Sequence, residues 1–107
     1  MKNKTKNIAI VGLGNIGLNL YKYLLNNKSQ LLKKTNVAPN IIFVSAKNIK
    51  KKRQITIPKH RWLNNYLDAS KLSEIDIVIE LIGGSEGPAK KLVFEALKNK
   101  KHVVTAN

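Results

Sequence analysis

The chain has 107 residues, enough for one small domain with a core, and we treat residues 1–107 as a single domain. It has no cysteine, which excludes disulfides and thiolate metal sites, and its apolar runs are too short for a membrane span or a signal peptide. Its 20 lysines and arginines against 6 acids give a formal charge of +14, and no acid precedes Asp68. A cationic N-terminal half suits nucleotide phosphate or nucleic acid, although solvated surface lysines explain it equally well. The simplest expectation is a cytoplasmic protein without membrane contact.

The first strong feature is a glycine turn between a strand and a helix. An apolar run from Ile8 to Val11 predicts the strand, and a helical pattern follows at once. Between them Gly12, Gly14 and Gly17 have the spacing of a dinucleotide-binding turn. In such a turn the first glycine permits the tight bend, the second lets the backbone approach a pyrophosphate, and the third brings the helix close to the strand. The helix N-terminus then offers its N–H groups to the phosphates. The alternative is a strand–helix turn with a structural role only.

Periodicity and helix breakers predict the elements that follow. A helix after the turn has its apolar face at Leu18, Leu20, Tyr21, Leu24 and Leu25, and a short helical piece over 29–35 is ended by Pro39. The run 40–46 predicts a strand buried on both faces, and a charged loop follows over 47–53. Short strands are possible at 55–57 and 61–63, and a short helix at 65–72.

The last third of the chain repeats the alternation of strand and helix. A strand at 76–82 ends at two glycines, a helix over 88–98 has its apolar face at Leu92, Val93, Ala96 and Leu97, and a final strand covers 102–105. This order predicts an α/β fold: a Rossmann-like, doubly wound parallel sheet, partial, with about four to five strands. Ligands of such sheets bind at the carboxyl ends of the strands, where three of these loops would meet. We also expect an exposed sheet edge that favours association.

The end of the second predicted strand lacks an acid. Enzymes selective for NAD usually place an Asp or Glu there to hold the ribose 2′-OH, whereas this chain has Lys47, with Lys50, Lys51, Lys52 and Arg53 close behind. Cations at this position favour a 2′-phosphate, which predicts NADP(H) preference or weak discrimination against NAD. Lys47 lies 30 residues beyond Gly17, further than the usual distance of about 20, and the helical piece at 29–35 would account for the difference. A merely solvated lysine loop is the alternative.

Four segments together carry a family resemblance. They are the glycine turn, Val-Ser-Ala-Lys-Asn at 44–48 followed by Lys-Lys-Arg at 51–53, Glu-Leu-Ile-Gly-Gly-Ser-Glu-Gly-Pro at 80–88, and Lys-His-Val-Val-Thr-Ala-Asn at 101–107. With them the sequence resembles homoserine dehydrogenase over nearly all of its length. Lys100 stands where that family usually has glycine, in a helix-to-strand turn. Lys47-Asn48 stands where Arg-Asp is common, which keeps a cation, drops an acid and leaves the choice of cofactor open.

The resemblance implies a function and a set of cofactor contacts. Members reduce L-aspartate 4-semialdehyde to L-homoserine with NAD(P)H, in threonine and methionine biosynthesis. Beside the glycines, Leu13, Asn15 and Ile16 resemble contacts to the cofactor phosphates, and Lys47 resembles the contact to the 2′-phosphate. Gly83 and Thr105 resemble residues that line the nicotinamide end. The cofactor expected is therefore NADP, with NAD possible.

Catalysis is not assigned to any residue of this chain. The family's catalytic lysine and acids, and its dimerisation region, lie beyond the point that matches Asn107, so we expect a truncated enzyme whose cofactor-binding part is inactive alone. A small-molecule substrate and a homo-oligomer are expected only of the full-length enzyme. His102 is read as structural, His60 as a solvated loop residue, Glu86 as a charge at a helix N-terminus and Trp62 as a core residue. Glu80 is read as structurally paired, or alternatively as near the site.

Two other function classes remain as alternatives. A non-catalytic nucleotide-sensing or interaction module would bind the cofactor without any catalytic segment. A nucleic-acid-binding protein is disfavoured, because no aromatic residues are interleaved with the Lys/Arg cluster to stack on bases.

Overall fold

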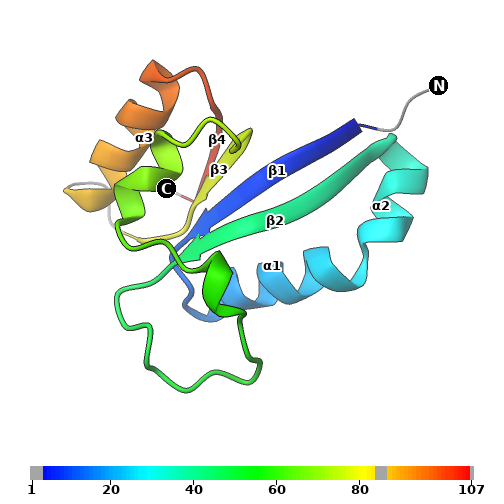
Figure 1. Cartoon of the computed structure of the whole chain (residues 1–107), viewed down its shortest axis with the longest axis horizontal. Helices are drawn as coiled ribbons and strands as arrows, with labels where there is room; N and C mark the ends of the chain where they lie inside the picture. The colour runs from blue at the N-terminus through cyan, green and yellow to red at the C-terminus, as the bar shows by residue number, and fades with distance from the viewer. Residues whose placement is uncertain (1–3, 84–86, 107) are drawn as a thin grey trace.

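A four-stranded parallel sheet forms the centre of the molecule, with helices on both of its faces (Figure 1). The computed structural model describes residues 4–83 and 87–106. The strands lie in the order β2-β1-β3-β4, so the chain moves from β1 to one side and later returns past β1 to the other. Their bounds are β1 Lys4–Val11, β2 Val37–Ser45, β3 Ile77–Glu80 and β4 His102–Thr105. The predicted doubly wound α/β sheet is confirmed.

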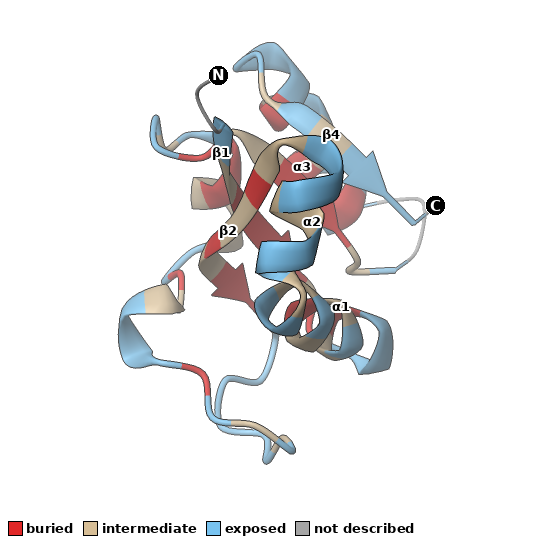
Figure 2. Ribbon diagram, turned by 90° about the vertical axis from the view of Figure 1, so that its right-hand side faces the viewer, coloured by how far each residue is buried: buried red, intermediate tan, exposed pale blue. Residues whose placement is uncertain are grey.

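The side chains of strand β1 pack into apolar clusters on both faces of the sheet. Side chains alternate along a strand, and here Ile8 and Ile10 enter one apolar cluster while Ala9 and Val11 enter the other. All four are at most 5% exposed. Figure 2 shows this buried interior along the strands, beneath helices whose outer surfaces are exposed. A strand buried on both faces reads as a continuous apolar run, as observed.

Helices α1 (Asn15–Asn26) and α2 (Lys28–Thr35) follow β1 and return the chain to the start of β2. Tyr21 is buried against the first cluster, with Leu20 and Leu24 packed beside it. The expectation that Leu25 also faces inward is wrong: it is 43% exposed, since it lies at the flank of the stripe that Tyr21 and Leu24 define.

Helix α3 (Pro88–Lys98) covers the second face and has the predicted bounds. Leu92 and Ala96 are fully buried one turn apart, and Pro88 occupies the first turn, where its missing N–H has no helical partner to lose. Leu97 was expected inward, but it is 55% exposed, because only the stripe through Leu92 and Ala96 meets the sheet.

Strand β2 is longer than predicted and contains Pro39, which does not end the preceding region as expected. β2 is an edge strand, paired only with β1 along its ladder, and an edge strand tolerates a proline because one row of its backbone groups has no partner to lose. As predicted, β2 packs on both faces, with Ile41 and Val44 in the first cluster and Ile42 and Phe43 against the second, although its edge position leaves about half of its residues only partly buried.

Between β2 and β3 the predicted short strands at 55–57 and 61–63 are wrong. Residues Lys59–Arg61 form the 3-10 turn η1, and Trp62 makes only an isolated bridge to Val44. Arg61 is held there because its Nη1 donates to the Tyr21 hydroxyl at 2.5 Å. The helix expected at 65–72 is the shorter 3-10 turn η2, Tyr66–Ser70, and β3 is likewise shorter than the predicted strand.

The outer edge of β4 is uncovered in the part of the chain that the structure describes. β4 pairs only with β3, Val104 is 55% exposed, and Figure 2 shows the strand on the surface. The expected exposed edge is therefore confirmed. Association through it remains a prediction.

Candidate functional site

The carboxyl ends of the strands form one row along an edge of the sheet. Val11 pairs with Ser45 on one side and with Glu80 on the other, and Glu80 pairs with Thr105. The segments that follow these residues therefore begin side by side. The chain reverses its winding direction between β1 and β3, and such a switch point is where ligands of open α/β sheets bind. We call this row the carboxyl edge.

Gly12 and Gly17 are required by the shape of the turn itself. Gly12 has φ +105°, and a Cβ placed there would lie 2.5 Å from the carbonyl carbon and oxygen of Leu81. A Cβ on Gly17 would lie 2.0 Å from the Gly12 oxygen. The first glycine thus makes the bend beside the end of β3, and the third lets α1 pack against the turn. Both roles agree with those predicted from spacing.

Gly14 has a different role, because the space beside it is empty. A Cβ on Gly14 would meet nothing within 4 Å, and its φ of −74° suits any residue. The protein's own packing therefore does not require glycine at this position. What glycine leaves there is an open approach to the backbone at the N-cap of α1, as a pyrophosphate needs.

The first turn of α1 contains backbone donors without a side-chain acceptor. The N-cap is Gly14, the cap carries no side-chain hydrogen bond, and the first turn holds no acid. The first helical hydrogen bond is donated by Leu18 N–H to the Gly14 oxygen at 2.9 Å. The earlier N–H groups, with the positive end of the helix dipole, suit a phosphate. Asn15 and Ile16 are exposed beside them, and Leu13 is buried in the core.

Lys47 reaches this edge because the end of β2 is bonded to the glycine turn. The Gly12 N–H donates to the Ser45 oxygen at 2.8 Å, and Lys47 lies two residues further on. Its side chain is exposed. Within residues 4–83 and 87–106 the ammonium group makes neither a hydrogen bond nor an ion pair, so it is available to an anion.

Arg53 is placed differently from Lys47. Its Nη1 donates to the oxygens of Ile49 (3.3 Å) and Lys51 (3.1 Å), and its Nη2 donates to the oxygen of Asn48 (2.9 Å). The guanidinium carbon also lies 5.3 Å from the centre of the Trp62 ring. Arg53 therefore holds the cationic loop in shape, and few of its donors remain for a cofactor.

Gly83 and Thr105 lie at the ends of the two remaining strands. Gly83 is exposed, has φ +90°, and would have open space around an added Cβ. The Thr105 hydroxyl donates a short hydrogen bond to Glu80 Oε1. Glu80 is fully buried, and its Oε2 accepts from the Ile82 N–H at 2.7 Å. Glu80 is thus structurally paired, as predicted, and it also lies at the carboxyl edge.

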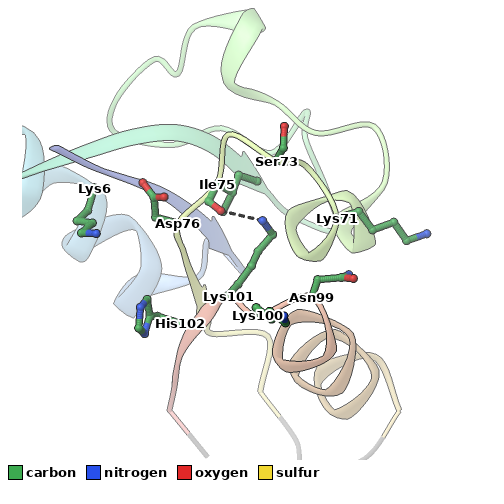
Figure 3. Close-up of a pocket in the computed structure, with 9 residues that line it drawn as sticks. All are labelled: Lys6, Lys71, Ser73, Ile75, Asp76, Asn99, Lys100, Lys101 and His102. Carbon is green, nitrogen blue, oxygen red and sulfur yellow. Dashed lines mark hydrogen bonds between the residues drawn. The ribbon is translucent and has the colours of Figure 1, made fainter.

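The opposite edge of the sheet contains a hollow of about 470 Å³ lined by several cations, shown in Figure 3. Its polar groups serve the fold. Lys101 Nζ donates to the oxygens of Leu72 (2.7 Å) and Ile75 (2.8 Å), and the Asp76 carboxylate accepts from the Asn7 N–H at 2.7 Å. Lys71 points away from the centre of the hollow in Figure 3. Its lining includes neither a glycine turn nor a helix N-terminus, and we do not assign it to the cofactor.

The remaining candidates lie away from the carboxyl edge or outside the described residues. His102 begins β4 at the amino edge, and His60 is exposed in η1. Trp62 packs against the core, as predicted. Glu86 lies outside the described residues, as do Gly84 and Ser85 of the same motif. Among residues 4–83 and 87–106, no group of three His, Cys, Asp or Glu could hold a metal.

Comparison with known proteins agrees with this geometry. The family model described as "Homoserine dehydrogenase, NAD binding domain" matches residues 12–107, from the first glycine of the turn onward. The chain belongs to this family. Membership of this family explains why the sheet, the glycine turn and the α1 N-terminus occur together. The residues present fit a nicotinamide dinucleotide.

Individual homoserine dehydrogenases match along almost the whole chain. The enzyme of Bacillus subtilis is 34% identical over 104 residues, covering 97% of this chain and 24% of the relative. Homoserine dehydrogenase of Staphylococcus aureus at pH 6.5 superposes with a TM-score of 0.85 at 34% identity, over 97% of this chain and 26% of the solved chain. Homoserine dehydrogenase of Thiobacillus denitrificans superposes with a TM-score of 0.85 at 34% identity, over 97% of this chain and 24% of the solved chain. The chain thus spans about a quarter of the length of these relatives.

Some contacts at the site could not be found from sequence. The bond between Gly12 and Ser45 and the packing of Gly12 on Leu81 join residues far apart in the chain. Glu80 and Thr105 stand in the motifs that carried the resemblance, but only the register of β3 and β4 joins their side chains.

Proposed function

We propose that the chain is the cofactor-binding part of an enzyme that interconverts L-homoserine and L-aspartate 4-semialdehyde, and that it prefers NADP(H) over NAD(H). The observation that carries the proposal is the carboxyl edge: a glycine turn, an α1 N-terminus with an open approach, and an exposed lysine at the end of β2. Bound there, the cofactor would supply hydride. The chain's own residues would hold its phosphates and ribose.

The proposed contacts follow from the placement of each residue. Backbone N–H groups from Gly12 to Gly17 would bind the pyrophosphate, with Leu13 fixing the turn from the core and Asn15 and Ile16 flanking it. Lys47 would bind the 2′-phosphate, on a loop that Arg53 holds in shape. Gly83 and Thr105 would line the nicotinamide end.

The proposed preference for NADP rests on charge. No acid precedes Asp68, so the sequence around the end of β2 offers no carboxylate to accept from a ribose 2′-OH. Lys47 offers a charge-assisted bond to a 2′-phosphate instead, of the kind that contributes about 1.5–3 kcal/mol.

The proposal is tested by titrating the chain with NADPH and NADH and following ligand fluorescence. We expect NADPH to bind more tightly, and Lys47→Ala to weaken NADPH binding at least tenfold, the equivalent of about 1.4 kcal/mol, while NADH binding changes little. The matched control is Lys98→Ala, which removes an exposed lysine from the last turn of α3. Tighter binding of NADH by the unaltered chain would contradict the NADP preference, and binding of neither cofactor would contradict the proposal as a whole.

The other expectations for this protein are proposals of the same kind. Hydride transfer to an aldehyde needs a proton donor near its oxygen, and no residue described at the carboxyl edge is assigned that role. We therefore propose that the chain alone binds cofactor and does not turn over homoserine, and that it acts in the cytoplasm. No helix in the described part of the chain has the length and apolar character needed to cross a membrane. Steady oxidation of homoserine by the 107-residue chain would contradict the proposed inactivity.

A further inference from the structure

Glu80 is a buried acid at the centre of the carboxyl edge. It is 0% exposed, and it is the last residue of β3, paired with Val11 just before the glycine turn and with Thr105 on the other side. Neighbouring strands lie about 4.8 Å apart, so this side chain is close to both the turn and the end of β4. A charged side chain is rarely buried without a partner.

The partners of Glu80 are hydrogen-bond donors and not cations. Oε2 accepts from the Ile82 N–H at 2.7 Å, and Oε1 accepts from the Thr105 hydroxyl. Over the described ranges 4–83 and 87–106, no lysine, arginine or histidine forms an ion pair with it. An ionised carboxylate accepts at both oxygens, and both oxygens of Glu80 accept here. Within these ranges the carboxylate therefore meets hydrogen-bond donors and no cation.

The two donors connect Glu80 to the part of the edge where the proposed function places the nicotinamide ring. Ile82 immediately precedes Gly83, and Thr105 is the other residue proposed to line that end. The Ala106 N–H also donates to the Glu80 backbone oxygen at 3.3 Å. Because side chains alternate along a strand, Glu80 shares the face of Val78, beneath α3, and not the face of Ile79.

The oxidised and reduced cofactors differ in charge at this ring. The nicotinamide of NAD(P)⁺ is a cation, and the dihydronicotinamide of NAD(P)H is neutral. A fixed carboxylate nearby attracts the first and not the second, and the attraction is strong in a partly desolvated site.

We propose that Glu80 has two roles in this site. It is a positioning residue that holds the 81–83 turn and Thr105 in place, and its carboxylate makes the site bind the oxidised nicotinamide more tightly than the reduced one. The inference rests on the proposed function, since it requires the nicotinamide to lie beside Gly83 and Thr105. It adds a discrimination between redox states that the glycine turn and Lys47 do not provide, because these contact parts of the cofactor that are the same in both states.

The test compares the dissociation constants of NADP⁺ and NADPH for the chain and for Glu80→Gln. Glutamine keeps the shape, accepts from the Ile82 N–H and removes the charge. We expect the ratio of the two constants to shift roughly three- to tenfold in favour of NADPH, the size of a charge–charge attraction across several ångströms at the effective dielectric constant of a protein surface. A purely structural role would weaken both ligands by the same factor.

Glu74→Gln is the matched control, because it removes the same charge from an exposed position beside the amino edge and should leave the ratio unchanged. If Glu80→Gln fails to fold by thermal melting, Thr105→Val takes its place. It removes one donor and keeps the charge, so the preference for NADP⁺ should be kept or increased. An unchanged ratio in Glu80→Gln, or a shift toward NADPH in Thr105→Val, would overturn the inference. Binding of neither cofactor by the unaltered chain would instead overturn the proposed function.

Discussion

The two edges of the sheet use their polar groups in opposite ways. At the amino edge, Asp76 accepts from Asn7, Lys101 donates to two carbonyl oxygens, and the Asn99 side chain donates to the Ser70 oxygen at 2.8 Å. At the carboxyl edge, the first turn of α1 has no side-chain cap and Lys47 is exposed. Polar groups that satisfy one another stabilise a fold, and polar groups held without a protein partner are suited to a ligand.

The amino-edge hollow is not the proposed site because its polar groups already bond to the protein. A hollow of about 470 Å³ at the amino edge is lined by cations, yet its best-placed lysine is already bonded to the backbone. At the carboxyl edge, by contrast, the first turn of α1 has no side-chain cap and the Lys47 side chain is exposed. Variants at the two edges should therefore separate stability from binding.

The largest effect is expected for Gly17→Ala. The added methyl would lie 2.0 Å from the Gly12 oxygen, and since that oxygen belongs to the backbone the turn must shift. We expect a loss of about 3 kcal/mol in the free energy of unfolding, as for a severe overpacking change, together with loss of cofactor binding. Urea denaturation would measure the first and an NADPH titration the second. A variant of native stability would contradict the close approach of α1 to the turn.

Gly14→Ala should affect binding and largely spare stability. Its methyl would meet no protein atom within 4 Å, so the free energy of unfolding should fall by no more than about 1 kcal/mol, from the poorer N-cap. The same methyl would occupy the approach of the pyrophosphate, and we expect NADPH to bind at least tenfold more weakly. Measuring stability and NADPH affinity for both Gly17→Ala and Gly14→Ala would separate the structural role of one glycine from the binding role of the other. Unchanged NADPH affinity would exclude the α1 N-terminus as the phosphate site.

Asp76→Ala at the amino edge should show the reverse behaviour. It removes the acceptor of the part-buried Asn7 N–H, and we expect a loss of about 1–2 kcal/mol in the free energy of unfolding. Cofactor affinity should remain within twofold, since the change lies at the far end of β3. A large loss of NADPH affinity in a folded variant would break the division between the two edges.

The smallest effect is expected for His102→Ala. The side chain is exposed at the start of β4 and lines the amino-edge hollow. Both the free energy of unfolding and the NADPH affinity should change by less than about 0.5 kcal/mol. A tenfold loss of affinity, measured in the same titration, would reopen the hollow as a cofactor site.

Local patterns were sufficient to predict most of the fold. The bounds of α3 and β4 follow from proline placement, periodicity and apolar runs, and they agree with the structure. The errors lie where tertiary contacts decide. Pro39 is tolerated because β2 is at the sheet edge. Trp62 meets Val44 by a single bridge, and the neighbouring Arg61 is bonded to Tyr21, far away in the sequence.

The sequence by itself determined the family, the parallel α/β sheet and the three glycines, because short motifs, apolar runs and the spacing of nearby residues are enough to predict each of them. Only the tertiary structure decided which groups at the carboxyl edge remain uncommitted. Arg53, predicted beside Lys47 from sequence alone, is bonded to three carbonyl oxygens of its own loop, whereas Lys47 is not. Glu80 acquires its position from strand register, which joins it to Val11 and Thr105 at once. Register and burial depend on contacts between distant residues, and local spacing does not contain them.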